Sequence, residues 1–322
     1  MKHPVKVSVI IPVYNVESYL PFALQSCIDQ TLVDVEFICV NDGSTDGSLE
    51  ILNRYAEIDK RIKVIDKPNG GVSSARNAGL DAANGRFIMF LDPDDYLAEN
   101  ACERVFIESE EGPTDIINFG TEIVPHKPRP TEWHYYALSV HTKRFFEFKP
   151  EILFLEPSAK PFIWHQAYSS ALLKKSGVRF NESLKLGEDM EFLMCLYPHA
   201  GKIAFIEDKL YCYRHIRKNS AMQVLRADKV KRMKQHLTVV EKTLCHWDAN
   251  GFTEKYGEWV LSWALEFIVH DLIDEDFSAE ERKILSKKLY DCFVEHNLLS
   301  FKKKLDRNGE GFYRALNKFL KG

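Results

Sequence analysis

The chain has no uninterrupted apolar run of the roughly 20 residues that a bilayer-spanning helix requires. The nearest candidate, residues 259–273, is broken by Ser, Glu, His and Asp side chains, so a buried helix is expected there. Residues 1–4 lead directly into a predicted strand and contain no apolar core of a signal peptide. We therefore expect a cytoplasmic protein.

Paired cysteines and an excess of positive charge are also missing. The seven cysteines include no C-x-x-C pair, which argues against a zinc knuckle or a disulfide framework and favours reduced thiols. A formal net charge of -4 argues against a general nucleic-acid binder. With 322 residues, 45% of them hydrophobic and 28% charged, the composition is that of a soluble globular protein with one large core or two domains.

Continuous apolar strands alternate with amphipathic helices in the first hundred residues. The predicted strands are residues 5–11, 35–40, 62–65 and 87–91. The predicted helices are residues 17–30, a helix ending at 55 that Ser44 or Thr45 caps, and a helix ending near 83 that Ser73 or Ser74 caps. This alternation predicts an α/β domain with a parallel sheet covered by helices.

Three carboxylates follow the strand at 87–91 directly, in Asp92-Pro93-Asp94-Asp95. Pro93 cannot donate to a sheet ladder, so the strand should end before it and leave the acids at its carboxyl end, where open α/β sheets bind ligands. Acids gathered there repel one another unless a cation lies among them, and Mg²⁺ prefers a few carboxylates plus phosphate oxygens. The alternative is a solvated acidic turn.

Four segments in this order closely resemble the family 2 glycosyltransferases. They are VSVIIPVYN at 7–15, VNDGSTD at 40–46, NGGVSSARNAG at 69–79 and FLDPDD at 90–95. The resemblance is strong over residues 5–100 and weaker to about 220. It implies a GT-A fold (Rossmann-like, with a mostly parallel central sheet flanked by helices), a nucleotide-sugar donor, a divalent Mn or Mg ion, and inversion at the anomeric carbon.

The resemblance implies that the uridine of a UDP-sugar binds at Pro12, Tyr14, Asn15 and Asp42. A base could lie against the Tyr14 ring, and the Asp42 carboxylate could accept the uracil N3–H. Taken alone, Asp42 could be a turn former and Tyr14 a half-buried packing ring.

Arg76 and the D-x-D triplet are expected at the donor phosphates. The resemblance places Arg76 near the diphosphate or the sugar, where a helix start also favours anions, while the alternative is a surface ion pair. Asp94 is the first-choice metal ligand, and Asp92 contacts ribose or shares the metal through water. Asp95 is expected to support these two residues without contacting the metal itself.

Gly187-Glu188-Asp189 begins a further predicted helix, with Asp189 in its first turn. The resemblance implies that Asp189 is the general base for an acceptor hydroxyl, close to Asp92 and Asp94, and that Glu188 orients the loop. The alternative is an acid stabilised by the helix dipole.

Two further segments resemble the family less closely. Arg214, Arg217 and Ser220 belong to a basic loop that could close over the diphosphate, with His215 as an alternative metal ligand; a solvated loop is equally compatible. Trp164 could line the acceptor side or belong to the core, and His165-Gln166 stands where many relatives have Asn-Lys.

Beyond residue 222 the sequence predicts only helices, at 228–247, 253–274, 278–297 and 311–321. We therefore expect a catalytic domain at 1–221 and a helical domain at 222–322, which could serve homodimerisation or acceptor binding. Its basic, amphipathic tail could contact an anionic membrane surface at the inner face of the plasma membrane, or simply pack on its own domain.

These features together predict an inverting, metal-dependent enzyme of polysaccharide biosynthesis. It would transfer a sugar from a UDP-sugar to a hydroxyl of a glycan or glycolipid acceptor. The alternatives are a nucleotidyltransferase that forms sugar nucleotides, although the phosphate loop expected after its first strand is missing, and a catalytically silent binding partner with the same fold.

Overall fold

The computed structural model describes residues 4–124, 132–159, 162–214, 228–274 and 276–321. The chain divides into two compact units: Met1–Glu182 with His199–Arg217, and Ser183–Pro198 with Lys218–Gly322. The boundary predicted at 221/222 put residues 183–198 in the first domain, whereas their contacts group them with the second unit. One such contact is a hydrogen bond of 2.8 Å from Trp247 Nε1 to the carbonyl of Met194.

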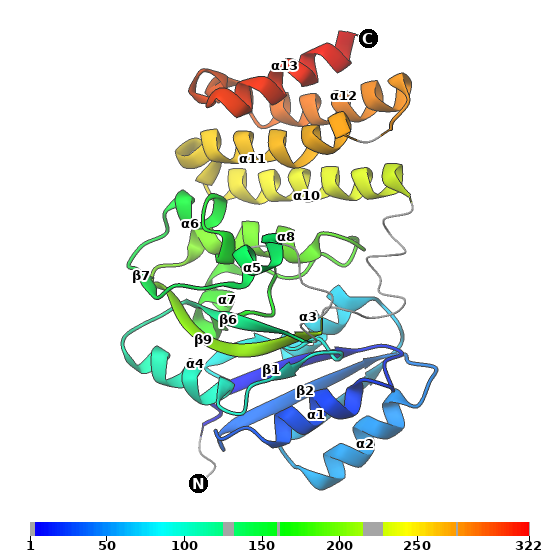
Figure 1. Ribbon diagram of the computed structural model, residues 1–322, viewed down its shortest axis with the longest axis vertical. Helices are drawn as coiled ribbons and strands as arrows, with labels where there is room; N and C mark the ends of the chain where they lie inside the picture. Colours follow the sequence, from blue (N-terminus) through cyan, green and yellow to red (C-terminus); the bar gives the residue numbers. More distant parts are fainter. Residues whose placement is uncertain (1–3, 125–131, 160–161, 215–227, 275, 322) are drawn as a thin grey trace. The chain divides into compact units, whose positions relative to one another are not determined.

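The first unit is built on a mixed, mostly parallel sheet (Figure 1). Its strands are β1 (Val7–Val13), β2 (Val35–Asp42), β3 (Ile62–Lys67), β4 (Phe87–Phe90), β5 (Tyr96–Leu97), β6 (Ile116–Val124), β7 (Lys143–Phe145), β8 (Gln166–Ser169) and β9 (Ile203–Arg214). The strand order is β3-β2-β1-β4-β8-β6-β9-β5, with β7 paired to β9. The strands β1 to β4 run parallel, as do β6 and β9, while β5, β7 and β8 pair antiparallel. The four strands predicted in the first hundred residues are therefore confirmed.

Helices cover both faces of this sheet because alternate strand residues point to opposite sides. The odd-numbered residues of β1 pack with α1 (Leu20–Ile28), α2 (Ser48–Ile58) and α4 (Ala101–Glu110) on one face. On the other face α3 (Val72–Ala82) lies against β1 and β2. The approach of α3 is close at Gly79, where an added Cβ would lie 2.3 Å from Ile10 Cγ2.

The strand β1 continues through Pro12 to Val13, two residues beyond its predicted end. A proline is tolerated there although the strand is central. The pairing with β4 ends at Ile10, so no ladder hydrogen bond toward β4 is lost at Pro12.

The predicted helix caps were wrong. The helices α2 and α3 begin after Gly47 and Gly71, and neither has a side-chain cap hydrogen bond. Ser44 instead accepts a hydrogen bond from the Asn15 backbone, which keeps it in the loop. The described residues that follow β6 begin with the helix α5 (Glu132–Leu138). The unit also contains α6 (Pro150–Phe154), η1 (Pro157–Ala159) and α7 (Ser170–Ser176).

The second unit is helical. Its main elements are α8 (Glu188–Leu196), α10 (Lys229–Ala249), α11 (Phe252–Asp274), α12 (Ala279–Glu295), η3 (Leu298–Lys304) and α13 (Arg307–Lys321); η2 (Tyr197–His199) follows α8. A capping box formed by Ser278 and Glu281 starts α12. Leu316 of α13 is fully buried in the packing of this helix on α11 and α12. Within the described residues, no helix has both the length and the apolar composition needed to cross a membrane.

Candidate functional site

The loops that follow β1 and β2 are joined by hydrogen bonds. Asn15 adopts a φ of 49°, and its side-chain oxygen accepts from the Thr45 backbone at 2.8 Å. Its own N–H donates to Ser44 Oγ at 3.1 Å. Tyr14, the residue before it, is 49% exposed. The loop therefore presents an aromatic ring at the carboxyl edge of the sheet, where the sequence predicted a base-binding surface.

The Asp42 carboxylate is buried at the end of β2 and holds the start of α3. Lys67 Nζ lies 2.6 Å from Oδ1, and the backbone N–H groups of Gly70 and Gly71 donate to Oδ1 and Oδ2 at 2.9 and 2.7 Å. Lys67 lies directly opposite Asp42 in the parallel pair of β2 and β3. This lysine was not predicted from the sequence, although opposite charges on neighbouring strands are a signal that points to it.

The three acids after β4 form one acidic loop, residues 92–95, which the far end of β9 holds. The Tyr211 hydroxyl donates to Asp95 Oδ2 at 2.8 Å and accepts from the Asp92 N–H at 3.2 Å. The Arg214 backbone N–H donates to Asp95 Oδ1 at 2.7 Å, and its Nε donates to the Asp94 carbonyl at 2.9 Å. The acidic loop is therefore a built structure and not a solvated turn.

Asp95 is 1% exposed. Burial, followed by the negative charges of Asp94 and Asp92, raises the pKa of Asp95 well above its usual range. Both of its oxygens are already engaged by β9, whereas the Asp92 and Asp94 side chains are partly exposed. The predicted supporting role suits Asp95 better than metal ligation does.

Arg76 lies beneath the acidic loop and is only 3% exposed. Its Nη2 is 3.4 Å from Asp92 Oδ1, and its guanidinium lies 5.2 Å from the centre of the Phe180 ring. The surface ion pair considered from the sequence is therefore wrong for this residue. A buried cation beside Asp92 compensates part of the negative charge of the loop.

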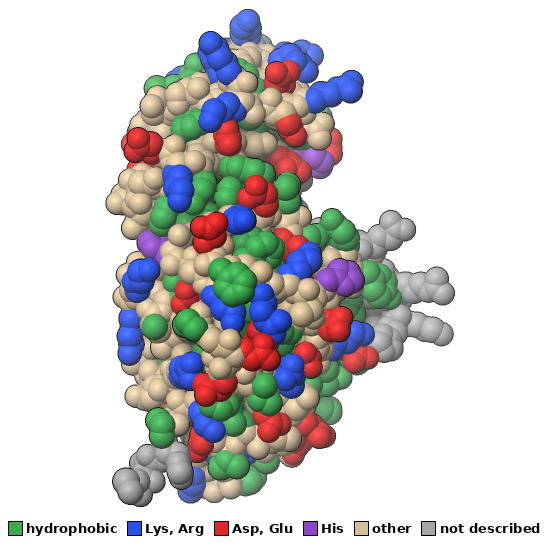
Figure 2. Space-filling model, turned by 90° about the vertical axis from the view of Figure 1, so that its left-hand side faces the viewer, with side chains coloured by type: hydrophobic (Ala, Val, Ile, Leu, Met, Phe, Trp, Pro, Cys, Tyr) green, Lys and Arg blue, Asp and Glu red, His purple; other side chains and the backbone are tan. Residues whose placement is uncertain are grey.

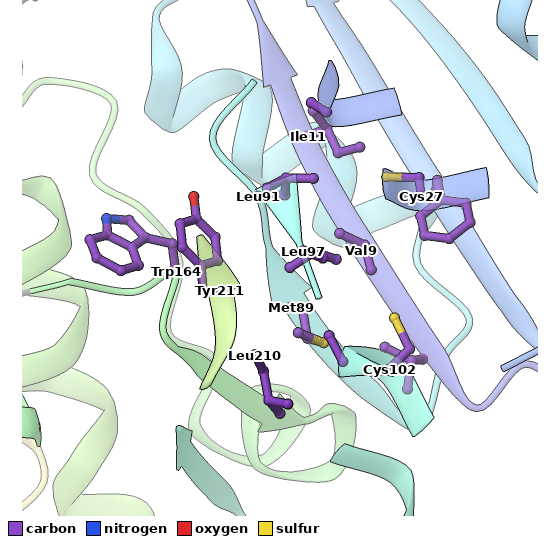
Figure 3. Close-up of a cluster of buried hydrophobic side chains, with 14 of the residues drawn as sticks. Val9, Ile11, Cys27, Met89, Leu91, Leu97, Cys102, Trp164, Leu210 and Tyr211 are labelled. Carbon is purple, nitrogen blue, oxygen red and sulfur yellow. The ribbon is translucent and has the colours of Figure 1, made fainter. Parts of the chain in front are cut away.

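An aromatic stack supports Tyr211 from behind (Figure 3). The Trp164 ring stacks on Tyr211 with centroids 4.6 Å apart, and also on Phe162 and Tyr213. Trp164 is 3% exposed, as the core interpretation expected. The neighbouring His165 is fully buried, and burial lowers its pKa to about 3, so this side chain is neutral.

Glu188 and Asp189 form the first turn of α8 after Gly187, which has a φ of 83°. This helix belongs to the second unit, so the predicted meeting of Asp189 with Asp94 stays a prediction. On the same helix Glu191 is buried, which raises its pKa to about 7. The predicted roles of His215, Arg217 and Ser220 fall outside the described residues.

No group of three or more His, Cys, Asp or Glu side chains suited to a metal occurs in the part of the chain that the structure describes. The acidic loop offers the two partly exposed carboxylates of Asp92 and Asp94. Hard divalent ions commonly bind one or two carboxylates together with substrate phosphates and water. The residues present therefore fit a Mn²⁺ or Mg²⁺ ion that arrives with a nucleotide diphosphate.

Comparison with known proteins finds a family model that matches part of this chain. Residues 8–165 match the model of glycosyl transferase family 2. The chain is 35% identical over 213 residues to the uncharacterized glycosyltransferase EpsJ of Bacillus subtilis, covering 65% of this chain and 60% of that protein. It is 30% identical over 224 residues to the poly(ribitol-phosphate) beta-N-acetylglucosaminyltransferase TarS of Staphylococcus aureus, covering 67% of this chain and 37% of TarS.

Solved structures show the same fold. The crystal structure of S. aureus TarS 1–349 in complex with UDP-GlcNAc matches with a TM-score of 0.61 and 22% identity, over 94% of this chain and 93% of that chain. The mannosyltransferase PcManGT of Pyrobaculum calidifontis, in complex with GDP-Man and Mn²⁺, matches with a TM-score of 0.53 and 15% identity, over 99% and 87%.

The chain spans 60% or less of the length of curated relatives that it matches, EpsJ among them. The solved structures confirm the predicted GT-A fold with its appended helical region, and the family match of residues 8–165 favours the glycosyltransferase class over the nucleotidyltransferase alternative.

Proposed function

We propose that the chain belongs to glycosyltransferase family 2, whose model residues 8–165 match, and that it transfers a sugar from a UDP-sugar to a hydroxyl of a glycan or glycolipid acceptor, with inversion. The observation that carries this proposal is the acidic loop at the carboxyl end of β4, held by Tyr211 and Arg214 with Arg76 beneath it. Such an edge of an open α/β sheet suits a nucleotide diphosphate.

UDP is the proposed donor nucleotide. The exposed Tyr14 ring offers a surface for the base, and the complex of S. aureus TarS with UDP-GlcNAc supports uridine. Asp42 already accepts three hydrogen bonds, so a uracil N3–H would share its oxygens with Lys67, Gly70 and Gly71. The names of several relatives point to phosphate-containing acceptors such as poly(ribitol-phosphate), which we propose as an acceptor class.

Asp94 and Asp92 would hold a divalent ion, and the Mn²⁺-containing neighbour supports this. When bound, the ion would neutralise charge on the departing diphosphate. Asp95 and Tyr211 position the acidic loop, and Arg76 lies against Asp92. Arg214 already contacts the loop, and Arg217, Ser220 and His215 follow it in the sequence as further candidate ligands of the diphosphate or metal.

Asp189 would accept the proton of the acceptor hydroxyl. At the same time the oxygen of that hydroxyl would bond to the anomeric carbon of the sugar, and the bond from this carbon to UDP would break. A positioned carboxylate in this role contributes roughly 10²–10⁴-fold to the rate. Glu188, next to it in the first turn of α8, would orient the residue.

Two substitutions separate these roles. We expect Asp94→Asn to lose the metal-dependent part of UDP binding, measured by calorimetry with and without Mn²⁺. We expect Asp189→Asn to bind UDP like the wild type but to transfer sugar about 10²–10⁴-fold more slowly. Glu57→Gln, an exposed change on α2, is the control that should alter neither quantity.

Two results would contradict the proposal. A wild-type protein that binds no uridine nucleotide in the presence of either metal would end the UDP assignment. Full transfer activity in Asp189→Asn would end the base assignment while leaving donor binding intact.

A further inference from the structure

The last 24 described residues, 298–321, carry most of the chain's charge asymmetry. They contain seven cations (Lys302, Lys303, Lys304, Arg307, Arg314, Lys318 and Lys321) against two acids, Asp306 and Glu310, although the whole chain has a formal charge of -4. All seven cationic side chains are exposed. Figure 2 shows Lys and Arg side chains projecting from its upper end, where Figure 1 places the C-terminal helices.

One face of α13 is apolar and packed against its own unit, and the other is basic and exposed. Its apolar residues pack toward α11 and α12: Leu316 is fully buried, and the Phe312 and Phe319 rings contact His270 and Arg282. The predicted packing of the tail on its own domain is therefore observed, and this use of the apolar face leaves it unable to insert elsewhere.

The opposite face of α13 is a basic hollow. Tyr313, Arg314, Asn317, Lys318 and Lys321 line an open depression of about 480 Å³. Spacings of three and four residues link them along one side of the helix. Among the described residues only Glu310 forms an ion pair with this set, at 3.5 Å from Arg314. The hollow therefore keeps a net positive charge.

We propose that this face of α13 binds the anionic headgroups of a lipid surface. Phosphate oxygens suit Lys and Arg donors, and Tyr is favoured at the headgroup level because its ring is apolar and its hydroxyl is polar. All five lining residues come from one helix, so the hollow has a single wall. A linear polyanion would be contacted by protein side chains on one side only. A flat lipid surface is matched by a single row of cationic side chains and needs no second contacting element.

The contact is electrostatic. No large hydrophobic side chain is exposed in residues 298–321, so nothing there adds an apolar anchor. Attraction of Lys and Arg to anionic lipids decays within a Debye length, and the binding should therefore weaken as salt rises. This inference goes beyond sugar transfer and does not depend on the proposed donor or base.

Vesicle flotation tests it in the absence of UDP and metal. The full chain should float with phosphatidylcholine vesicles that contain phosphatidylglycerol, and not with pure phosphatidylcholine. Arg314→Gln/Lys318→Gln/Lys321→Gln should weaken binding about 100-fold, because each charge near an anionic surface contributes roughly fivefold. Lys60→Gln/Lys174→Gln/Lys175→Gln removes the same charge from exposed sites of the first unit and should leave flotation unchanged.

Three outcomes would overturn the proposal: no flotation with the anionic vesicles, equal loss in both triple variants, or binding to soluble polyphosphate while the vesicles stay unbound. Circular dichroism should show the same helix content in both variants, because all substituted side chains are exposed. Failure of sugar transfer would leave the flotation result unaffected, so the two proposals are tested separately.

Discussion

Tyr211→Phe removes one oxygen atom from the support of the acidic loop and keeps the ring that stacks on Trp164. The lost hydroxyl donates to Asp95 Oδ2 at 2.8 Å and accepts from the Asp92 N–H at 3.2 Å. Both Tyr211 and Asp95 are almost completely buried, so water cannot easily replace these bonds. Each buried polar group left without its partner costs about 1–3 kcal/mol, and we expect the free energy of unfolding to fall by about 2–4 kcal/mol.

That loss is smaller than the roughly 5–15 kcal/mol stability of ordinary domains, so the variant should fold. Urea unfolding measures the stability change, and amide hydrogen exchange reports the Asp92 N–H directly. We expect protection of this amide to fall and the Mn²⁺ concentration for half-maximal UDP binding to rise, because the carboxylates are less well positioned.

Tyr168→Phe is the matched control. Tyr168 is also fully buried, and its hydroxyl has two acceptors within hydrogen-bonding distance, the Ile163 carbonyl at 3.3 Å and Gln166 Oε1 at 3.2 Å. It should lose stability without changing exchange at Asp92 or the requirement for Mn²⁺. Our reasoning is refuted if Tyr211→Phe unfolds at the wild-type urea concentration with Asp92 still protected, or if both variants alter Asp92 equally.

Two further predictions concern the cores. Burial lowers the pKa of His165 to about 3, below its value of about 6.5 in the unfolded chain, so the unfolded state gains protons first as the pH falls. The free energy of unfolding of the wild type should therefore fall by about 2 kcal/mol between pH 7 and about pH 5 because of this group. Urea unfolding of His165→Leu should show a fall that is smaller by this amount, and an identical pH dependence in the two proteins would contradict the prediction. Gly79→Ala should destabilise the protein by about 1–3 kcal/mol because the new Cβ would collide with Ile10. Gly311→Ala in α13 should stabilise it by about 0.5–1 kcal/mol, because no atom lies within 4 Å of the added Cβ and alanine favours a helix. Equal melting temperatures of the two variants would contradict this pair of predictions.

The sequence predicts the position of the acidic loop because the signals for it are local. An apolar run followed at once by Pro93 and three acids places the carboxylates at a strand end, and β4 ends at Phe90 as that pattern requires. The support of the loop is not local. Tyr211 and Arg214 lie more than a hundred residues further along the chain, and they reach the loop through the pairing of β5 with β9. No periodicity in the sequence identifies the strand with which β9 pairs.

The helix caps show that a local sequence signal can also fail. Ser44 and Ser73 have side chains that commonly cap helices, yet neither caps one here, because hydrogen bonds between distant segments set where α2 and α3 begin. Asn15 binds Ser44, and the buried Asp42 carboxylate accepts from Gly70 and Gly71 at the start of α3, beyond which Ser73 lies inside the helix. A cap is worth about 1 kcal/mol, and a buried charged carboxylate with three donors outweighs it.

The acidic loop and the first turn of α8 are held by different elements, and this explains why separate motifs predict each of them. The acidic loop is fixed by β9 within the first unit. The first turn of α8 is fixed in the second unit: Gly187 adopts a φ of 83°, a Cβ added there would lie 2.8 Å from Val239 Cγ2 of α10, and Trp247 of α10 donates to the Met194 carbonyl. Asp94→Asn and Asp189→Asn should consequently act without disturbing each other's local structure, since the residues that hold one carboxylate belong to a different core from those that hold the other.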